Sequence, residues 1–356
     1  MDVRKSAVDL SATERDAFLE ALIRLKHRPA STGVAGASRY DQFVALHGAV
    51  FAVLAPGLPP GTTVNFGHWN IGFCAWHRRY LRDIEKELQA EVAGVTLPYW
   101  DWTDHVGAVR ALFTAEFLGS LRVGAPGPVT DSVLRNPVPP ADRPAWWPAE
   151  AEGFPIHPAL QDQFGPALAR GSVGVGWPPT AAGISQLEQL VEQRDGHPLW
   201  YFWLVLEQGL PQITSRTHNR GHNFIGGHMS SGFSPNDPIF LLHHANVDRL
   251  WARWQSQRLA AVPGSVPEDH YPPPTELSPF DGDPAPPGHS LNDAMWPWVG
   301  DASGFDADVD TAVRQLLPDL SNRPAVTVKD VLDPETIDPV GYRYAAPDDA
   351  QPVRRK

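Results

Sequence analysis

Cysteine is nearly absent from this sequence, because Cys74 is the only one in 356 residues. A single thiol forms no intramolecular disulfide and provides no thiolate cluster for a metal. Long hydrophobic runs are absent too, since no apolar stretch approaches the length of a membrane span. The N-terminal residues contain no apolar core of a signal peptide, and Ser11 and Glu14 have the spacing of a capping box. We therefore expect no membrane segment and no signal peptide of the chain's own.

Positive charge is also scarce. Lys and Arg total 29 against 41 Asp and Glu, which gives a formal net charge of −12. Nucleic acids and anionic membranes bind basic surfaces, so neither is an expected partner. Aromatic residues, by contrast, are plentiful, with 13 Trp, 15 Phe and 7 Tyr. They provide enough apolar mass for a folded core, which excludes global disorder.

Apolar residues recur at helical spacing in several segments, whereas strand-like alternation is rare. The segments that we expect to be helical are residues 40–54, 76–92, 215–224 and 238–258. Asp237 is positioned as the N-cap of the last segment, with Pro238 in its first turn. Proline-rich stretches at 125–179 and 262–297 predict long irregular loops between and after these helices.

No linker or internal repeat divides the chain into independent cores. The pattern predicts a mainly α fold, an antiparallel four-helix bundle with long irregular Pro-rich loops. We expect a single domain over residues 1–356, with its helical core at about 40–260 and a C-terminal segment at about 300–356 packing on that core.

Four histidines cluster in the second half of the chain. His218 and His222 are four residues apart, so a helix would place both rings on one face, where they can hold one metal ion. His243 and His244 lie within an apolar helical run. Adjacent helical residues point in different directions, so at most one of this pair faces the same metal. Asp248 is placed to hydrogen-bond a neighbour of the site.

Three more histidines lie close together in the first half: His47 in an apolar helix, His68 in a turn rich in Gly and Asn, and His77 at the start of a helix. Each alone is also compatible with a buried histidine bonded to a carbonyl. Two sets of three imidazoles without thiolate ligands differ from closed four-coordinate zinc sites, and the Glu-x-x-His motifs of di-iron bundles are absent. Two copper ions with open coordination positions fit this pattern best.

Two segments resemble the signatures of a known family. Residues 68–85, HWNIGFCAWHRRYLRDIE, are similar to the copper A signature of tyrosinases, and residues 237–248, DPIFLLHHANVD, are similar to the copper B signature. Residues 40–47, 97–102 and 218–222 resemble the family in the same order. The chain is thus similar to the tyrosinase and polyphenol oxidase family of type 3 dicopper proteins, and to its bacterial members in particular.

The resemblance implies a ligand set and a reaction. It assigns His47, His68 and His77 to copper A, and His218, His222 and His244 to copper B, with His243 as a packing neighbour. The implied centre binds dioxygen as co-substrate and oxidises o-diphenols to o-quinones. In tyrosinases proper it also hydroxylates monophenols at the ortho position. The expected partner is therefore a small phenolic substrate.

The resemblance also implies roles for residues around the copper ions. Glu207 and Asn219 are expected to hold a water that helps to deprotonate a monophenol. Asn223 is expected at the pocket mouth, Gly232 is expected to leave the entry open, and Phe240 is expected to wall the pocket. The segment from Gly341 to Tyr344 resembles the Tyr-x-Tyr motif that closes the catalytic domain of longer relatives.

Two alternatives use the same copper ligands. An o-aminophenol oxidase would form quinone imines, and a haemocyanin-like protein would carry oxygen reversibly. A panel of tyrosine, a catechol and an o-aminophenol separates them. Some bacterial relatives without a signal peptide are loaded with copper and exported by a small partner, so we expect the chain to be cytoplasmic or exported with such a copper-delivery protein.

Overall fold

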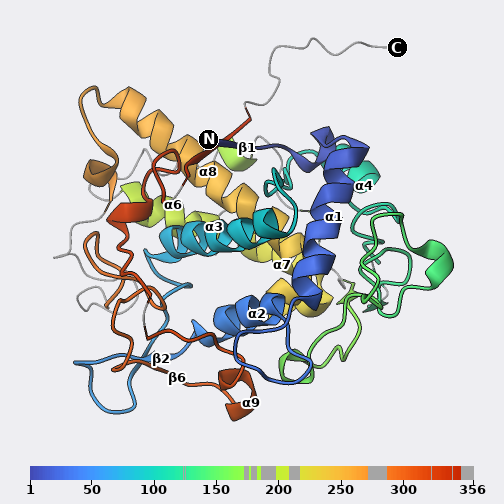
Figure 1. Cartoon of the computed structure of the whole chain (residues 1–356). Coiled ribbons are helices and arrows are strands. Elements are labelled where there is room, and N and C mark those ends of the chain that lie inside the picture. The colour runs from blue at the N-terminus through green and yellow to red at the C-terminus, as the bar shows by residue number, and fades with distance from the viewer. Residues whose placement is uncertain are drawn as a thin grey trace, which may run out of the picture.

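The structure is a computed structural model that describes residues 1–122, 124, 126–171, 176–177, 183–185, 198–207, 217–271, 287–321, 323–338 and 340–345. Helices dominate this part of the chain (Figure 1). They are α1 (Ala12–His27), α2 (Arg39–Ala49), α3 (Phe73–Glu91), α4 (His105–Ala111), α6 (Pro198–Glu207), α7 (His218–Ile225), α8 (Ile239–Ala261) and α9 (Thr311–Arg314). The prediction of a mainly α fold with long irregular loops is confirmed.

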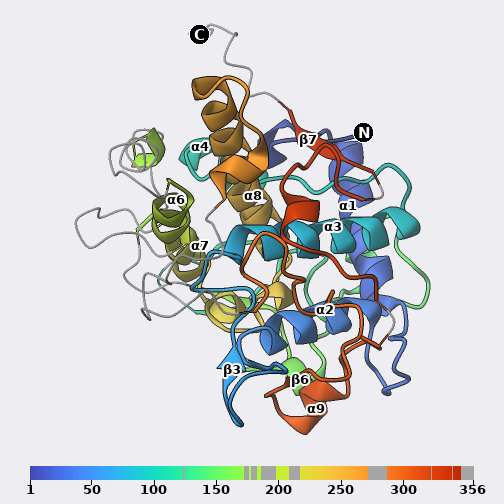
Figure 2. The ribbon, with the colours of Figure 1, turned by 90° about the vertical axis from the view of Figure 1, so that its left-hand side faces the viewer.

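The longest helices form the centre of the molecule. α3 packs against α8 and α1, and α7 lies against α8, while α6 contacts both α3 and α7. Two views at right angles show α3 and α8 in the middle, with α2 below α3 and α1 along its side (Figures 1 and 2). The arrangement of four of these helices as an antiparallel bundle stays a prediction.

Local sequence determines where the first helices begin. Ser11 and Glu14 form the predicted capping box at the start of α1, because the side chain of each accepts a hydrogen bond from the backbone N–H of the other. Ser38 and Asp41 make a second capping box that begins α2. The Asp41 carboxylate also pairs with buried Lys26 of α1 at 2.5 Å. These contacts connect the start of α2 to α1.

Several predicted boundaries differ from the structure. The helix expected at 40–54 ends at Ala49, because Val53 and Leu54 form strand β2, which pairs with β3 (Thr63–Val64) and β6 (Asp306–Ala307). The last long helix begins at Ile239. Asp237 nevertheless accepts a hydrogen bond from the Ile239 N–H, at 3.1 Å. Residues 215–216 of the helix expected at 215–224 lie outside the described residues.

Three small sheets connect distant parts of the chain. β4 (Gly127–Pro128) pairs with β5 (Ala169–Arg170), and β1 (Asp2–Arg4) pairs in parallel with β7 (Tyr342–Tyr344). The second pairing brings the two ends of the described chain together beside α8 (Figure 1). In the described part of the chain, no helix combines the length and the apolar character needed to cross a membrane.

Candidate metal centre

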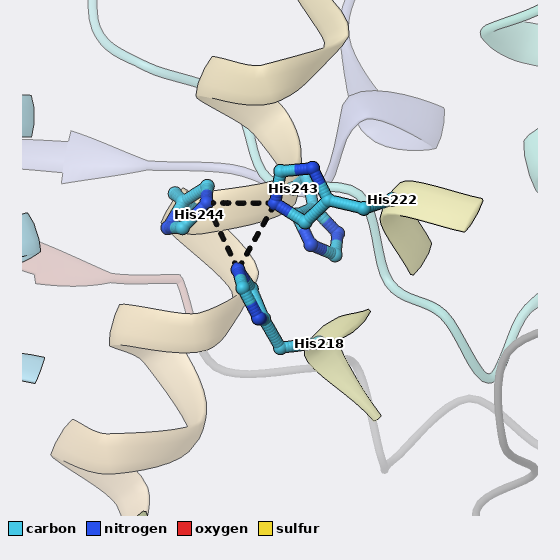
Figure 3. A group of neighbouring side chains, drawn as sticks. All are labelled: His218, His222, His243 and His244. Atoms are coloured by element: carbon cyan, nitrogen blue, oxygen red, sulfur yellow. Dashed lines mark hydrogen bonds between the residues drawn. The ribbon is translucent and has the colours of Figure 1, made fainter. Parts of the chain in front are cut away.

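Three histidine nitrogens from two helices meet at one point. α7 presents His218 and His222, and α8 presents His244. The Nε2 atoms of His222 and His218 are 3.0 Å apart, and each is 3.2 Å from Nε2 of His244 (Figure 3). A point about 1.8 Å from all three lies at the centre of this triangle, close to the roughly 2.0 Å bond of a histidine-bound metal ion.

The other ring nitrogens show where the protons lie. The Nδ1–H of His222 donates to the Met229 carbonyl at 2.7 Å, and that of His218 donates to Asn219 Oδ1 at 2.9 Å. A neutral imidazole carries one proton, so the Nε2 atoms of both rings present lone pairs. Lone pairs at such a separation repel one another unless a cation lies between them. The residues present therefore fit a bound metal ion.

His243 has a different environment. Its Nδ1 accepts a hydrogen bond from the Trp102 indole N–H at 3.1 Å, so its proton is on Nε2 when the ring is neutral. The ring stacks on His218 with centroids 5.1 Å apart. It packs against Gly221, where a Cβ atom would lie 2.2 Å from the ring. His243 thus orients the neighbouring ring, and none of the three close nitrogen contacts in Figure 3 involves it.

The second triad comes from α2, the loop before α3, and α3 itself. The Nδ1–H of His47 donates to the Gly232 carbonyl at 2.7 Å, and the Nδ1–H of His77 donates to the Phe73 carbonyl at 2.9 Å. Their Nε2 atoms are buried without a hydrogen-bond partner in the described part of the molecule. His68 completes the group, with one nitrogen of each ring within 4.8 Å of the others. These unpaired acceptors also fit a metal ion.

The two triads adjoin each other. His77 stacks on His244 with centroids 4.2 Å apart and planes 16° apart. Phe240 is fully buried and also stacks on His244, with centroids 4.1 Å apart. Burial lowers the pKa of every ring in both triads, to about 3 for His47 and about 4 for His222. All six rings are therefore neutral near pH 7, as metal ligands must be.

A cavity of about 300 Å³ opens onto both triads. It is lined by side chains of both clusters and by the residues expected around them: His47, Phe51, His68, Trp69, Glu207, His218, Asn219, His222, Asn223, Met229, Ser230, Ser231, Gly232 and Ser234. Phe240, which we expected in the wall, lies behind the histidines instead, because it is fully buried under His244. A larger cavity of about 640 Å³ beside α8 has no histidine in its lining.

Glu207 is the carboxyl group nearest to this chemistry. It is fully buried at the end of α6, and its two oxygens accept from the Trp69 backbone N–H at 2.8 and 3.0 Å. Burial raises the pKa of Glu207 to about 8, against the opposing effects of Trp69 and Trp203. A purely structural role for Glu207 would be an ion pair with Arg216 or Arg220. The Nε–H of Arg220 donates to the Gly176 carbonyl at 2.9 Å. Arg216 lies outside the described residues.

Several residues of the centre were not anticipated from the sequence. The carbonyls of Phe73, Met229 and Gly232 orient ligand rings, and a backbone acceptor has no residue type that could reveal it. Trp102 lies in a recognised segment, but its contact with His243 required the fold. Asp248, which we expected to hydrogen-bond a neighbour of the site, binds Arg78, the residue after His77 in α3, and Arg4 of β1.

Known proteins resemble this chain in sequence and in fold. Residues 37–257 match the family described as the common central domain of tyrosinase. A tyrosinase from Streptomyces glaucescens is 34% identical over 272 residues, which are 74% of this chain and 85% of that protein. A grixazone synthase from Streptomyces griseus is 32% identical over 277 residues, 72% of this chain and 84% of that protein.

A solved structure shares the fold. The polyphenol oxidase from Thermothelomyces thermophila superposes with a TM-score of 0.59 at 21% identity. The superposition covers 97% of this chain and 89% of that chain. The two proteins therefore share the overall fold.

Proposed function

The chain belongs to the tyrosinase family, and from this premise we propose that it oxidises o-diphenols to o-quinones with dioxygen at a centre of two copper ions. It is a type 3 dicopper phenol oxidase by family, and the two histidine triads fit the metal. The observation that carries the proposal is the convergence of three Nε2 atoms within 3.2 Å of one another beside a second triad.

We assign the ligands from the grouping of their ring nitrogens. His47, His68 and His77 would hold one copper, and His218, His222 and His244 would hold the other. The copper pair supplies dioxygen binding and electron transfer when it is present. The protein supplies neutral imidazoles, fixed in orientation by the Met229, Gly232 and Phe73 carbonyls. Such outer contacts fix the tautomer of each ligand.

Glu207 and Asn219 are placed to act on the proton of a monophenol. Both line the cavity, and the Asn219 Oδ1 is occupied by His218, which leaves its amide N–H groups to hold a water or a phenol oxygen. A carboxylate whose pKa is raised to about 8 is a stronger base than an ordinary glutamate, and it is better matched to a phenol of pKa about 10. We propose that Glu207 receives the phenol proton through such a water.

Diphenol oxidation is expected to be faster than monophenol hydroxylation. Oxidation requires electron transfer from two adjacent oxygens, whereas hydroxylation also requires removal of a proton from a weakly acidic phenol. Asn223 and Gly232 border the approach to the centre, and a Cβ atom on Gly232 would be in ordinary contact with Phe51 at 3.7 Å. The small residue therefore leaves room at the mouth for a substituted ring.

Metal analysis and a substrate panel test the proposal together. Protein loaded with excess copper and then desalted should retain about two copper ions per chain. It should oxidise a catechol faster than tyrosine and faster than an o-aminophenol. One tightly held zinc contradicts the metal assignment. Faster quinone imine formation supports the o-aminophenol oxidase instead, and reversible oxygen binding without turnover supports a carrier.

Copper has to reach a buried site, since the ligand rings are enclosed except where the cavity opens. We propose that a small copper-delivery protein serves this step, and that the chain is cytoplasmic or exported with that partner. Copper uptake by the isolated protein, measured against free copper over time, tests the need for delivery. Complete and rapid loading without a partner contradicts it.

A further inference from the structure

We propose that Trp69 forms a platform at the mouth of the cavity, and that its indole favours phenolic substrates with an amine on the ring substituent over those with a carboxylate. This inference rests on the proposed phenol oxidation and names its substrate class. Trp69 follows the ligand His68 directly in the chain and lines the same cavity.

Trp69 is unusual in its exposure. Its side chain is 59% exposed, and it is the only mostly exposed tryptophan among those whose side chains the structure describes. The indole meets Phe51 edge to face at 6.0 Å, and Phe51 stacks on His68 at 4.1 Å. A continuous aromatic surface thus leads from solvent to a ligand ring. Large exposed aromatic side chains beside a cavity are typical of binding surfaces.

The backbone holds the indole in this position. Trp69 has φ of 56°, in the left-handed region that a bulky residue rarely adopts. Its N–H donates to both oxygens of buried Glu207, so the loop is attached to the end of α6 at this residue. Strain of this kind persists where the surrounding contacts determine the conformation, and it clusters at functional sites. The indole is therefore pre-positioned at the cavity mouth.

The charges around the mouth indicate the preferred substituent. Among the described residues that line the cavity, none is Lys or Arg, and Glu207 is the one carboxyl group. The chain as a whole has a formal net charge of −12. A carboxylate on the substrate finds no cationic partner in this lining, whereas an ammonium group is attracted to the face of an indole. Charge and aromatic surface thus favour the same substrates.

The test compares two catechols with the same ring, dopamine and 3,4-dihydroxyphenylpropionic acid. Steady-state KM and kcat are measured for the copper-loaded wild type and for Trp69→Ala, Trp69→Gly and Trp69→Phe, with copper content verified. We expect a lower KM for dopamine in the wild type. Loss of the indole in the Ala and Gly variants should raise the KM for dopamine about three- to tenfold. The effects on kcat and on the KM for 3,4-dihydroxyphenylpropionic acid should be smaller. Trp69→Phe should retain most of the preference for dopamine.

The Gly variant separates the side chain from the backbone. Glycine adopts positive φ without strain, so equal effects of Ala and Gly identify the indole as the cause. Trp146→Ala is the matched control, because Trp146 is half-buried and does not line the cavity. An unchanged ratio of the two KM values in Trp69→Ala and Trp69→Gly overturns the platform. A KM ratio that changes in Trp69→Ala but equals the wild-type ratio in Trp69→Gly overturns it too. Absence of turnover of either catechol by the wild type overturns the proposed oxidation itself, and the platform with it.

Discussion

At the scale of single residues, the two adjacent histidines of α8 differ by one hydrogen bond. The Nδ1 of His243 accepts from Trp102, whereas Nε2 of His244 points toward two other rings. Sequence and helical geometry indicate that one of the pair faces the metal, but the tautomer follows from Trp102, which lies 141 residues away in the chain. Substitution of the two residues is therefore expected to affect copper binding differently.

Replacement of each histidine by alanine should give different copper contents. His244→Ala removes one of three ligands and should reduce the protein to about one copper per chain, because imidazole ligands set the affinity of the site. His243→Ala should retain about two, with weaker binding, since orienting contacts modulate affinity by about 10- to 100-fold. Metal analysis after desalting measures both. Equal loss in the two variants would contradict the ligand assignment.

Glu207 and Asn219 provide a prediction about reaction type. If they hold the water that takes the phenol proton, Glu207→Gln should reduce monophenol hydroxylation by roughly 10²- to 10⁴-fold while diphenol oxidation changes much less. Asn219→Ala should act in the same direction. The ratio of monophenol to diphenol turnover is the measurement, with copper content confirmed in each variant. An unchanged ratio in both leaves these residues with structural roles.

The raised pKa of Glu207 also predicts a pH dependence of stability in the copper-free protein. Its folded pKa of about 8 exceeds the ordinary value of 4.5, so its contribution is fully present below pH 4.5 and is lost as the pH rises through 8. Glu207→Gln should therefore lose less stability than the wild type between pH 5 and 8.5. Thermal unfolding of both copper-free proteins measures this. The buried histidines, whose lowered pKa values affect stability at acidic pH, are present in both the wild type and the variant. Parallel plots of unfolding temperature against pH for the two proteins would contradict the prediction.

At the scale of elements, α8 is attached to the rest of the fold by a buried charged network. Asp248 lies one turn after His244 and binds Arg78 of α3 at 2.5 Å and Arg4 of β1 at 3.2 Å. Burial raises the pKa of Asp248, but the two arginines and the hydroxyls of Tyr342 and Tyr344 outweigh it and keep the pKa below its ordinary value. The carboxylate is therefore charged inside the protein.

Removal of the Asp248 charge should destabilise the folded protein. Asp248→Asn leaves the buried guanidinium of Arg78 without its carboxylate partner, while Arg4 keeps its pair with Glu85, and should lower the free energy of unfolding by about 3–5 kcal/mol. Asp306→Asn is the matched control, because its ion pair with Arg314 is about half exposed and such pairs contribute about 1 kcal/mol or less. Denaturant unfolding of both variants gives the comparison. A loss at Asp248 no larger than at Asp306 would contradict the role of the network.

The elements also show which parts of the fold follow from sequence. Local signals were sufficient for the capping box of α1 and for the i, i+4 pair of α7, because both depend on neighbours in the chain. The predicted end of α2 was wrong because Val53 and Leu54 pair with residues 306–307 in a β-sheet. This long-range pairing outweighs the helical periodicity of the local sequence. The positive φ of Trp69 depends on Glu207, 138 residues away, so no local pattern could reveal it.

At the scale of the whole molecule, the proposed copper pair would connect several elements of the fold. The proposed ligands come from α2, α3, α7, α8 and the loop before α3. A metal that binds only the folded chain stabilises it, by about 4 kcal/mol when the free metal exceeds its Kd by about 1,000-fold. Removal of copper by a chelator should therefore lower the unfolding temperature, and restoration of copper should reverse the change.

Calorimetry of the loaded, stripped and reloaded protein measures this effect. His157→Ala serves as the control, since His157 belongs to neither triad, and the variant should show the same shift as the wild type. His77→Ala should show a smaller shift, because one of its two sites has lost a ligand. An equal shift in His77→Ala and the wild type would place the stabilising metal elsewhere.

The pairing of β1 with β7 has a consequence for synthesis. Arg4 bonds to Tyr344 across 340 residues, and ribosomes add about 5–20 residues per second, so Arg4 emerges roughly 20–70 s before its partner. During that interval β1 lacks the strand beside which it lies in the finished protein. A nascent chain interrupted before Tyr342 would bury Arg4 and Asp248 without the two tyrosine hydroxyls. Proteases that degrade unstable chains would thus distinguish interrupted products from finished ones, long before any enzymatic activity could be assayed.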